Sequence, residues 1–163
     1  MQTVLPENVA PTPDSTALGL RSPRIELCVP ARRSYLAMIQ EVTQAFLSRW
    51  MDPAGESGLE ILLAVQEACT NVVRHAYKGR TAGDLQYRME VDHDVLRIFI
   101  SDDGCGFDPS RIPAPDPQCP LEGGYGLYLM GQLVSKVTYS REGSRNTTIL
   151  EKSLLGRCKD SLE

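Results

Sequence analysis

The chain has 163 residues, a size at which one domain can bury a core of its own. Its formal net charge of −4 lacks the basic surplus of a protein that binds nucleic acid directly. Apolar runs such as ILLAV (61–65) are far shorter than the ~20 residues that cross a bilayer, and the first residues lack the charged-then-apolar order of a signal peptide. We therefore expect a cytoplasmic protein without a nucleic-acid or membrane partner.

The five cysteines are scattered along the chain, and none forms a C-x-x-C pair with another. This spacing argues against a disulfide framework and against a structural zinc site. We expect reduced thiols that mostly serve in packing.

Four of the eleven prolines fall within residues 1–23, where no hydrophobic period is present. This composition predicts a flexible N-terminal tail over 1–23, one folded domain over 24–155 and a short C-terminal tail over 156–163. Alternating apolar residues then predict a strand over 24–29, and a helical period predicts a helix over 33–51.

Pro53 and Gly55 interrupt the pattern, and a second helix is predicted over 57–77. The remaining predicted elements are two strands over 85–91 and 95–104 joined at DHD, a proline-rich loop over 108–124, a short helix over 125–134, and two strands over 136–141 and 146–154 joined at EGS. Hairpins mixed with helices predict an α/β (α+β) two-layer sandwich, with one mostly antiparallel sheet covered by helices on one face.

The second predicted helix carries three polar residues four positions apart, Glu67, Asn71 and His75. At about 100° per residue they lie on the border of an apolar arc. That arc consists of Leu59, Leu62, Leu63, Thr70 and Val73. Taken alone, such a line is typical of the solvated edge of an amphipathic helix, so other motifs must decide whether it forms a site.

A second motif, DDGCGFD, places Asp102, Gly104 and Gly106 at the end of an apolar strand. A carboxylate there can accept a hydrogen bond from an exocyclic amine, and the glycines allow backbone to approach a flat ring, although Asp and Gly also favour simple turns. A third motif, EGGYGLYLM, puts glycines before a helix, where free N–H groups favour phosphate or form a plain junction. Neither a P-loop nor a dinucleotide fingerprint occurs.

A fourth motif, NTTIL, adds a threonine pair at the start of the last strand. Together, in this order and spacing, the four motifs resemble the Bergerat-fold ATPases, the superfamily of gyrase, heat-shock chaperones, histidine kinases and MutL. Within it, E-A-x-x-N-x-x-x-H-x-Y and the single compact domain resemble the anti-sigma-factor serine kinases of bacterial partner-switching systems, over residues 24 to about 154. The resemblance implies ATP and Mg²⁺ as cofactors, a protein partner and, as a family expectation, a homodimer.

The resemblance also implies roles for the residues at the phosphate end of the site. Asn71 would be the magnesium ligand through its amide oxygen, and Glu67 the general base or orienting group for the attacking hydroxyl. Gly124 and Gly126, with Leu127 beside them, would contribute to the phosphate contacts at the start of the short helix.

At the base end, the resemblance implies that Asp102 accepts the adenine amino group and that Gly104 and Gly106 open room for the ring. Thr147 would support the adenine pocket. His75 fits either a nucleotide contact or a structural histidine.

The chain departs from the family pattern in three places, one of which is Cys105 between the two glycines of the second motif, to which we assign no chemistry. Asn146 stands where a glycine usually precedes the threonine pair, and Glu122 with Gly123 replaces a residue that is often basic. Two hypotheses follow. The first is an ATP-dependent serine/threonine protein kinase that binds a sigma factor or similar regulator and phosphorylates an anti-sigma-factor antagonist. The alternative is a non-catalytic, nucleotide-dependent module that sequesters its partner, which the replacement of that often basic residue in the loop before the short helix favours.

Overall fold

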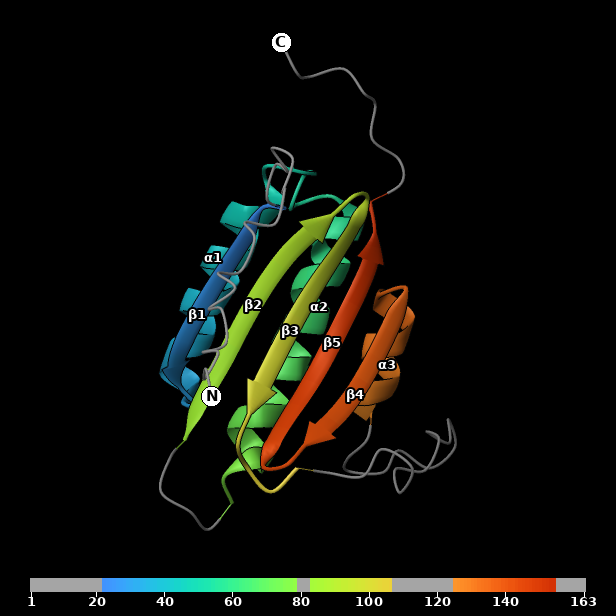
Figure 1. Ribbon diagram of the computed structural model, residues 1–163. Coiled ribbons are helices and arrows are strands. Elements are labelled where there is room, and N and C mark those ends of the chain that lie inside the picture. Colours follow the sequence, from blue (N-terminus) through green and yellow to red (C-terminus); the bar gives the residue numbers. More distant parts are fainter. Residues whose placement is uncertain (1–21, 79–82, 107–124, 155–163) are drawn as a thin grey trace, which may run out of the picture.

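The computed structural model describes residues 22–78, 83–106 and 125–154. The elements in chain order are β1 (Arg24–Pro30), a short 3-10 turn (Arg33–Tyr35), α1 (Leu36–Leu47), α2 (Glu56–Asn71), a π-helical turn (Val72–Ala76), β2 (Asp84–Asp92), β3 (Val95–Asp102), α3 (Tyr125–Leu133), β4 (Lys136–Glu142) and β5 (Arg145–Ser153) (Figure 1). The expected proline-rich loop and both expected tails lie outside the described residues, apart from Ser22 and Pro23.

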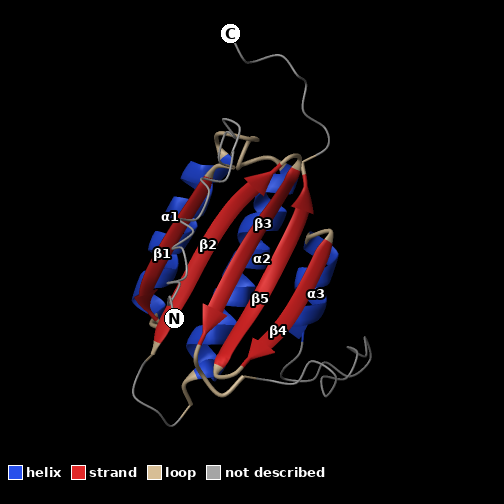
Figure 2. Cartoon of the chain, in the orientation of Figure 1, coloured by secondary structure: helices blue, strands red, loops and turns tan. Residues whose placement is uncertain are grey.

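The strands form a 5-stranded sheet in the order β1-β2-β3-β5-β4, in which every neighbouring pair is antiparallel. Helices α1, α2 and α3 all cover the same face of this sheet (Figure 2). The predicted two-layer α+β sandwich with helices on one face is therefore confirmed. The last strand in the chain, β5, lies between β3 and β4. After α3 the chain therefore forms the edge strand β4 first, and β5 then inserts between β4 and β3.

The core lies between the sheet and the helices, as the alternation in the strands requires. In β2 the side chains of Leu85, Tyr87, Met89 and Val91 are buried, while the residues between them face the other side. Leu96, Ile98 and Ile100 of β3 repeat the pattern, and the predicted hairpin turn at His93 adopts a positive φ of 53°. Because side chains alternate along each strand, these facts show which residues of the sheet face the helices, and Asp102 is one of them.

The apolar face of α2 differs from the predicted arc. Leu59 and Leu63 are exposed, with relative exposures of 56% and 42%. The buried residues of α2 are Gly58, Ile61, Leu62, Ala64, Val65, Ala68 and Cys69. The prediction for Leu59 and Leu63 was wrong because it weighted large apolar side chains, whereas several of the buried positions carry small residues.

Beyond Asn71 the helix does not keep the α-helical period either. Residues Val72–Ala76 form a π-helical turn, so the 100° spacing used to align His75 with Glu67 and Asn71 does not apply there. His75 is exposed. Partial desolvation of its ring, together with the charges of Lys78 and Arg74, lowers its pKa.

Three cysteines belong to the described residues, and all three are free thiols, as predicted. Burial raises the pKa of Cys69 to about 12, which keeps its thiol protonated and unreactive. No helix in the described part of the chain is both long and apolar enough to cross a membrane.

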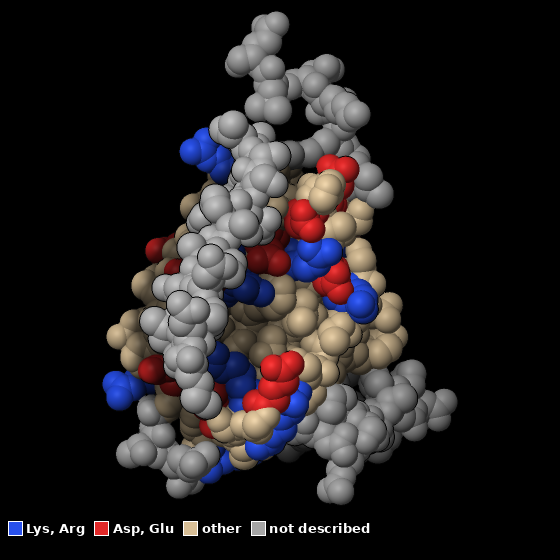
Figure 3. Space-filling model, viewed as in Figure 1, with Lys and Arg blue, Asp and Glu red and all other residues tan. Residues whose placement is uncertain are grey.

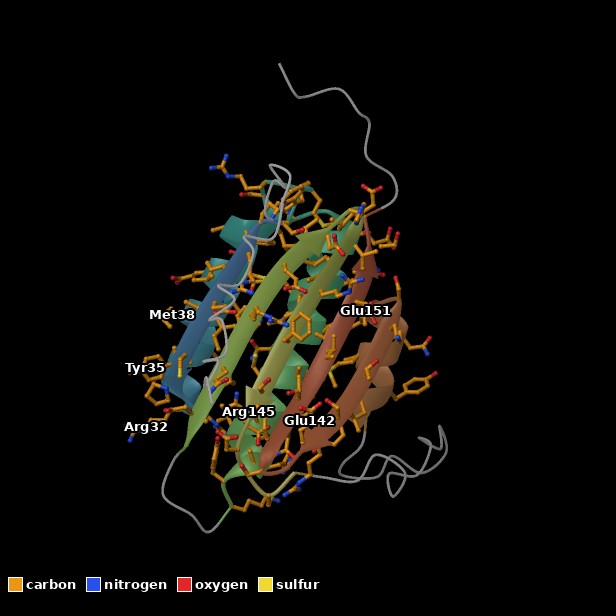
Figure 4. All side chains as sticks on the ribbon, viewed as in Figure 1. Arg32, Tyr35, Met38, Glu142, Arg145 and Glu151 are labelled. Atoms are coloured by element: carbon orange, nitrogen blue, oxygen red, sulfur yellow. The ribbon has the colours of Figure 1, made fainter. Side chains whose placement is uncertain are left out.

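The face of the sheet opposite the helices carries interspersed acidic and basic side chains (Figure 3). Arg145 and Glu151, both on β5, are labelled on this face in Figure 4. Arg88 lies over the ring of Phe99, 3.8 Å from its centroid. The same face contains a groove of about 560 Å³, lined by Glu26, Leu27, Cys28, Gln86, Tyr87, Arg88, Phe99, Ser101, Arg145 and Thr147.

Candidate functional site

The carboxylate of Glu67 and the amide of Asn71 meet the first turn of α3 at Gly126. A methyl group placed on Gly126 would lie 2.8 Å from Oε2 of Glu67, and 3.6 and 3.9 Å from Nδ2 and Oδ1 of Asn71. Both polar side chains therefore face α3 and are half-buried. The fold thus brings three of the predicted site residues together, from elements more than fifty positions apart in sequence. Gly124 lies outside the described residues.

At the other end of the site, the carboxylate of Asp102 closes a tight turn. Its Oδ1 accepts the backbone N–H of Gly104 at 2.8 Å, and Asp102 is only 8% exposed. The backbone N–H of Cys105 continues the turn by donating to the carbonyl of Ala76 at 2.8 Å. This bond ties the strand-end turn to the π-helical turn after α2.

Gly104 is required by close contact with that helix end. A methyl group there would lie 2.2 Å from the carbonyl oxygen of Ala76 and 2.7 Å from its Cβ. Gly106 is required for a different reason, since its φ is +69° and a side chain would meet Nη1 of Arg141 and Oδ1 of Asn146. The glycines therefore allow close backbone packing on one side and a left-handed turn on the other.

Gly104→Ala is expected to destabilise the fold by about 1–3 kcal/mol, because neither the carbonyl of Ala76 nor the turn can move away without breaking the Cys105 bond. Thermal unfolding measures the loss. Gly131→Ala is the matched control, since nothing lies within 4 Å of that position in α3, and this helical substitution should be neutral or stabilising. An equal midpoint for both variants would contradict the packing described here.

The β4–β5 hairpin holds the turn after Asp102 from the other side. Nδ2 of Asn146 donates to Oδ1 of Asp102 at 2.8 Å and to the carbonyl of Gly104 at 3.3 Å. The hydroxyl of Tyr139 donates to Oδ1 of Asn146 at 2.9 Å. Nη1 of Arg141 donates to the carbonyl of Cys105. The side chain of Asn146 is thus central to this end of the site, and it is 1% exposed.

Two further contacts complete the frame of the turn. The hydroxyl of Tyr77 accepts the N–H of Asp103 at 3.1 Å and donates to the carbonyl of Asp84 at 2.7 Å. Burial raises the pKa of Tyr77, so its proton is retained for this bridge. Arg145 forms an ion pair with Asp103, with N–O distances of 3.3 and 3.4 Å. Tyr77 therefore has a structural role at the end of its motif.

Thr147 is not brought into this group. Its hydroxyl lies 2.9 Å from that of Ser101 and faces the open groove, on the side of the sheet opposite Asp102. Residues of one strand alternate between faces, so Thr148, which lies between Asn146 and Leu150, is the threonine on the helix side. Thr147 therefore lies on the other side of the sheet from Asp102, the residue beside which it was expected to support the adenine pocket. Leu127 is half-buried and packs against the core.

The sequence reasoning missed Asn146, Tyr139 and Arg141. Residues 139 and 141 are two positions apart in β4 and therefore lie on the same face of the sheet. This could have been inferred from the sequence. What the sequence does not give is the register that sets Arg141 opposite Asn146 and Asn146 opposite Asp102. Asn146 lies inside β5 with a negative φ, so it needs none of the backbone freedom of glycine.

Comparisons with known proteins identify similar sequences. A family described as the histidine kinase-like ATPase domain matches residues 29–152. The serine-protein kinase RsbW of Bacillus subtilis is 33% identical over 144 residues, covering 83% of this chain and 89% of the relative. The protein of the same name from Bacillus pumilus is 36% identical over 123 residues, covering 69% and 75%.

Two solved structures share the fold. The RsbU and RsbW domains of Rv1364c from Mycobacterium tuberculosis superpose with a TM-score of 0.58 at 17% identity, over 80% of this chain and 32% of that chain. A blue-light activated histidine kinase of Erythrobacter litoralis gives a TM-score of 0.51 at 25% identity, over 77% and 42%. The chain thus spans less than half of either solved chain.

Proposed function

Because the chain belongs to the histidine kinase-like ATPase domain family, and to the serine-protein kinases within it, we propose that it transfers the γ-phosphate of ATP to a serine or threonine of a regulatory protein. One observation carries the proposal. Glu67 and Asn71 converge on the first turn of α3 at Gly126, so an acid and an amide oxygen lie where a helix N-terminus favours phosphate. The Bergerat-fold resemblance drawn from the sequence motifs is confirmed by the family match.

The donor set fits a magnesium-nucleotide complex. Within residues 22–78, 83–106 and 125–154, no three side chains of His, Cys, Asp or Glu gather into a metal site. Mg²⁺ usually takes one or two protein oxygens and completes its shell with phosphates and water. Asn71 is the residue that would hold it, and a bound Mg²⁺ would neutralise charge that develops on the transferred phosphoryl group.

The chain's own residues would then position and deprotonate the acceptor. The acceptor hydroxyl oxygen forms a bond to the γ-phosphorus, the bond from that phosphorus to the bridging oxygen of ADP breaks, and the hydroxyl proton passes to the carboxylate of Glu67. Gly126 leaves the space between α3 and α2 that this arrangement needs.

At the other end of the site, Asp102 would recognise the adenine of ATP. Among the described residues, the hydrogen bonds to this carboxylate all reach Oδ1, from Gly104 and Asn146. Oδ2 is the remaining acceptor, and an exocyclic amine is the donor that it suits. Gly104 and Gly106 let the backbone stay close to the ring. His75 stays a prediction at this site.

The proposed partners are a sigma factor or similar regulator and an anti-sigma-factor antagonist that receives the phosphate, in a partner-switching system of the cytoplasm. This proposal rests on the family resemblance, as does the homodimer. The alternative of a non-catalytic sequestering module is less well supported, because Glu67 and Asn71, the proposed general base and metal ligand, both lie beside α3 at Gly126.

Transfer of label from γ-labelled ATP to protein in a native lysate tests the proposed kinase. A small labelled protein is expected only when the purified chain is added with Mg²⁺, and phosphoamino-acid analysis should identify serine or threonine. If the lysate is supplemented with the candidate antagonist and still no label is transferred, while the chain binds ATP, the sequestering module replaces the kinase.

A further inference from the structure

We propose that Asn146 is a positioning residue that sets the base specificity of the site, acting through Asp102 rather than by touching the nucleotide. The inference deepens the proposed ATP-dependent function and rests on it. Its basis is the hydrogen-bond chain from Tyr139 to Asn146 to Asp102, which joins the C-terminal hairpin to the end of β3.

The first step is that the amide of Asn146 has only one orientation that satisfies its neighbours. Nδ2 faces two acceptors, the carboxylate of Asp102 at 2.8 Å and the carbonyl of Gly104 at 3.3 Å. Its Oδ1 receives the hydroxyl of Tyr139 at 2.9 Å. A flipped amide would set its oxygen against two other oxygens, so the contacts at both ends fix the side chain.

The second step is that this amide orients the carboxylate. Asn146 and the N–H of Gly104 both donate to Oδ1 of Asp102, each at 2.8 Å. Two donors on one oxygen fix the plane of the carboxylate and present Oδ2 as a pure acceptor. A pure acceptor at that point favours a 6-amino purine and opposes a 6-oxo purine, whose oxygen would face another oxygen.

The third step is that burial makes the hydrogen bond from Asn146 to Asp102 important for nucleotide binding. Asp102 is 8% exposed and Asn146 is 1% exposed, so water cannot readily replace a missing donor. In the family pattern that the sequence resembles, this position is usually glycine, which has no side chain to donate. The base specificity of this chain therefore depends on a side-chain contact that the usual motif lacks.

The test compares the dissociation constants of ATP and inosine triphosphate, which carries a 6-oxo group, by calorimetric titration with Mg²⁺. Wild type should prefer ATP by about 10- to 100-fold, as one charge-assisted hydrogen bond allows. Asn146→Asp keeps the size of the side chain but offers no N–H to Asp102. It should reduce the preference about tenfold or more, since the paired carboxylates then repel or share a proton that Oδ2 can donate to a 6-oxo group.

Tyr139→Phe is the second variant, which decides the matter if the first does not fold. It keeps both donors of the amide and removes the hydroxyl that anchors the amide oxygen, so a smaller fall in preference is expected. Ser140→Ala, on the opposite face of β4, should leave the preference unchanged. Asp102→Ala shows what preference for ATP over inosine triphosphate remains when the carboxylate is removed completely.

Three results are decisive. A preference that falls in Asn146→Asp and Tyr139→Phe supports the proposal. Affinities for both nucleotides that weaken equally show that Asn146 acts only in stability, which overturns it. A wild type that binds ATP but shows no preference removes the adenine-reading role of Asp102 and this proposal with it, whereas the kinase proposal is decided separately by label transfer.

Discussion

Replacement of Glu67 by glutamine is expected to lower phosphate transfer to the partner protein by about 10²–10⁴-fold, the range that a positioned general base contributes. The substitution keeps the length and shape of the side chain, so the contact with α3 at Gly126 should survive. It removes the carboxylate that would take the proton of the acceptor hydroxyl. The affinity for ATP should therefore change little, and the loss should appear in the rate of transfer.

Single-turnover transfer from γ-labelled ATP to the purified partner measures this loss, and titration with ATP measures binding. Glu56→Gln is the matched control, because it removes an exposed carboxylate from the first turn of the same helix. Unchanged transfer in Glu67→Gln would remove Glu67 as the base. Loss of binding alongside transfer would assign Glu67 to holding the nucleotide instead.

The second large effect is expected from Asn71→Ala, which should abolish the part of ATP binding that depends on Mg²⁺. The amide oxygen of Asn71 is the hard ligand that the site offers at this point, and alanine supplies none. The variant should bind ATP no better with Mg²⁺ than with a chelator present. Its fold should be intact, since Asn71 is half-buried and forms no part of the hydrophobic core.

Calorimetric titration with Mg²⁺ and with chelator separates the two contributions. Asn71→Asp retains an oxygen ligand and should recover Mg²⁺-dependent binding, whereas Thr70→Ala, one residue earlier in α2, should bind as wild type does. An unchanged affinity in Asn71→Ala would reject the metal assignment.

The sheet is largely predictable from the sequence, because each strand faces the helices with every second residue. Leu85, Tyr87 and Met89 alternate without interruption, and the observed strand β2 extends the prediction by one residue at each end. The start of helix α2 is predictable to within one residue, but its end at Asn71 and its orientation are not. Leu59 and Leu63 suggested the wrong face, because they are exposed whereas Ala64 and Ala68 are among the buried residues of α2.

The candidate site was predictable where its residues lie close in sequence. Glu67 and Asn71 are one helical turn apart, and Asp102 and Gly104 share a single turn of backbone. Contacts across the fold were not predictable in the same way. The bond from Asn146 to Asp102 depends on the register of β5 against β3, and a shift of one residue would have reversed which threonine faces the helices.

The position of β5 between β3 and β4 also bears on how the protein is made. Asp102 leaves the ribosome well before its partner Asn146, which lies 44 positions later. Until Arg145–Ser153 has emerged, one edge of β3 has no neighbouring strand. Asp102, at the adenine end of the site, then lacks its hydrogen bond from Asn146. A chain that ends prematurely in β4 therefore yields no partly active enzyme. It presents an open strand edge, the feature by which incomplete chains aggregate or engage chaperones.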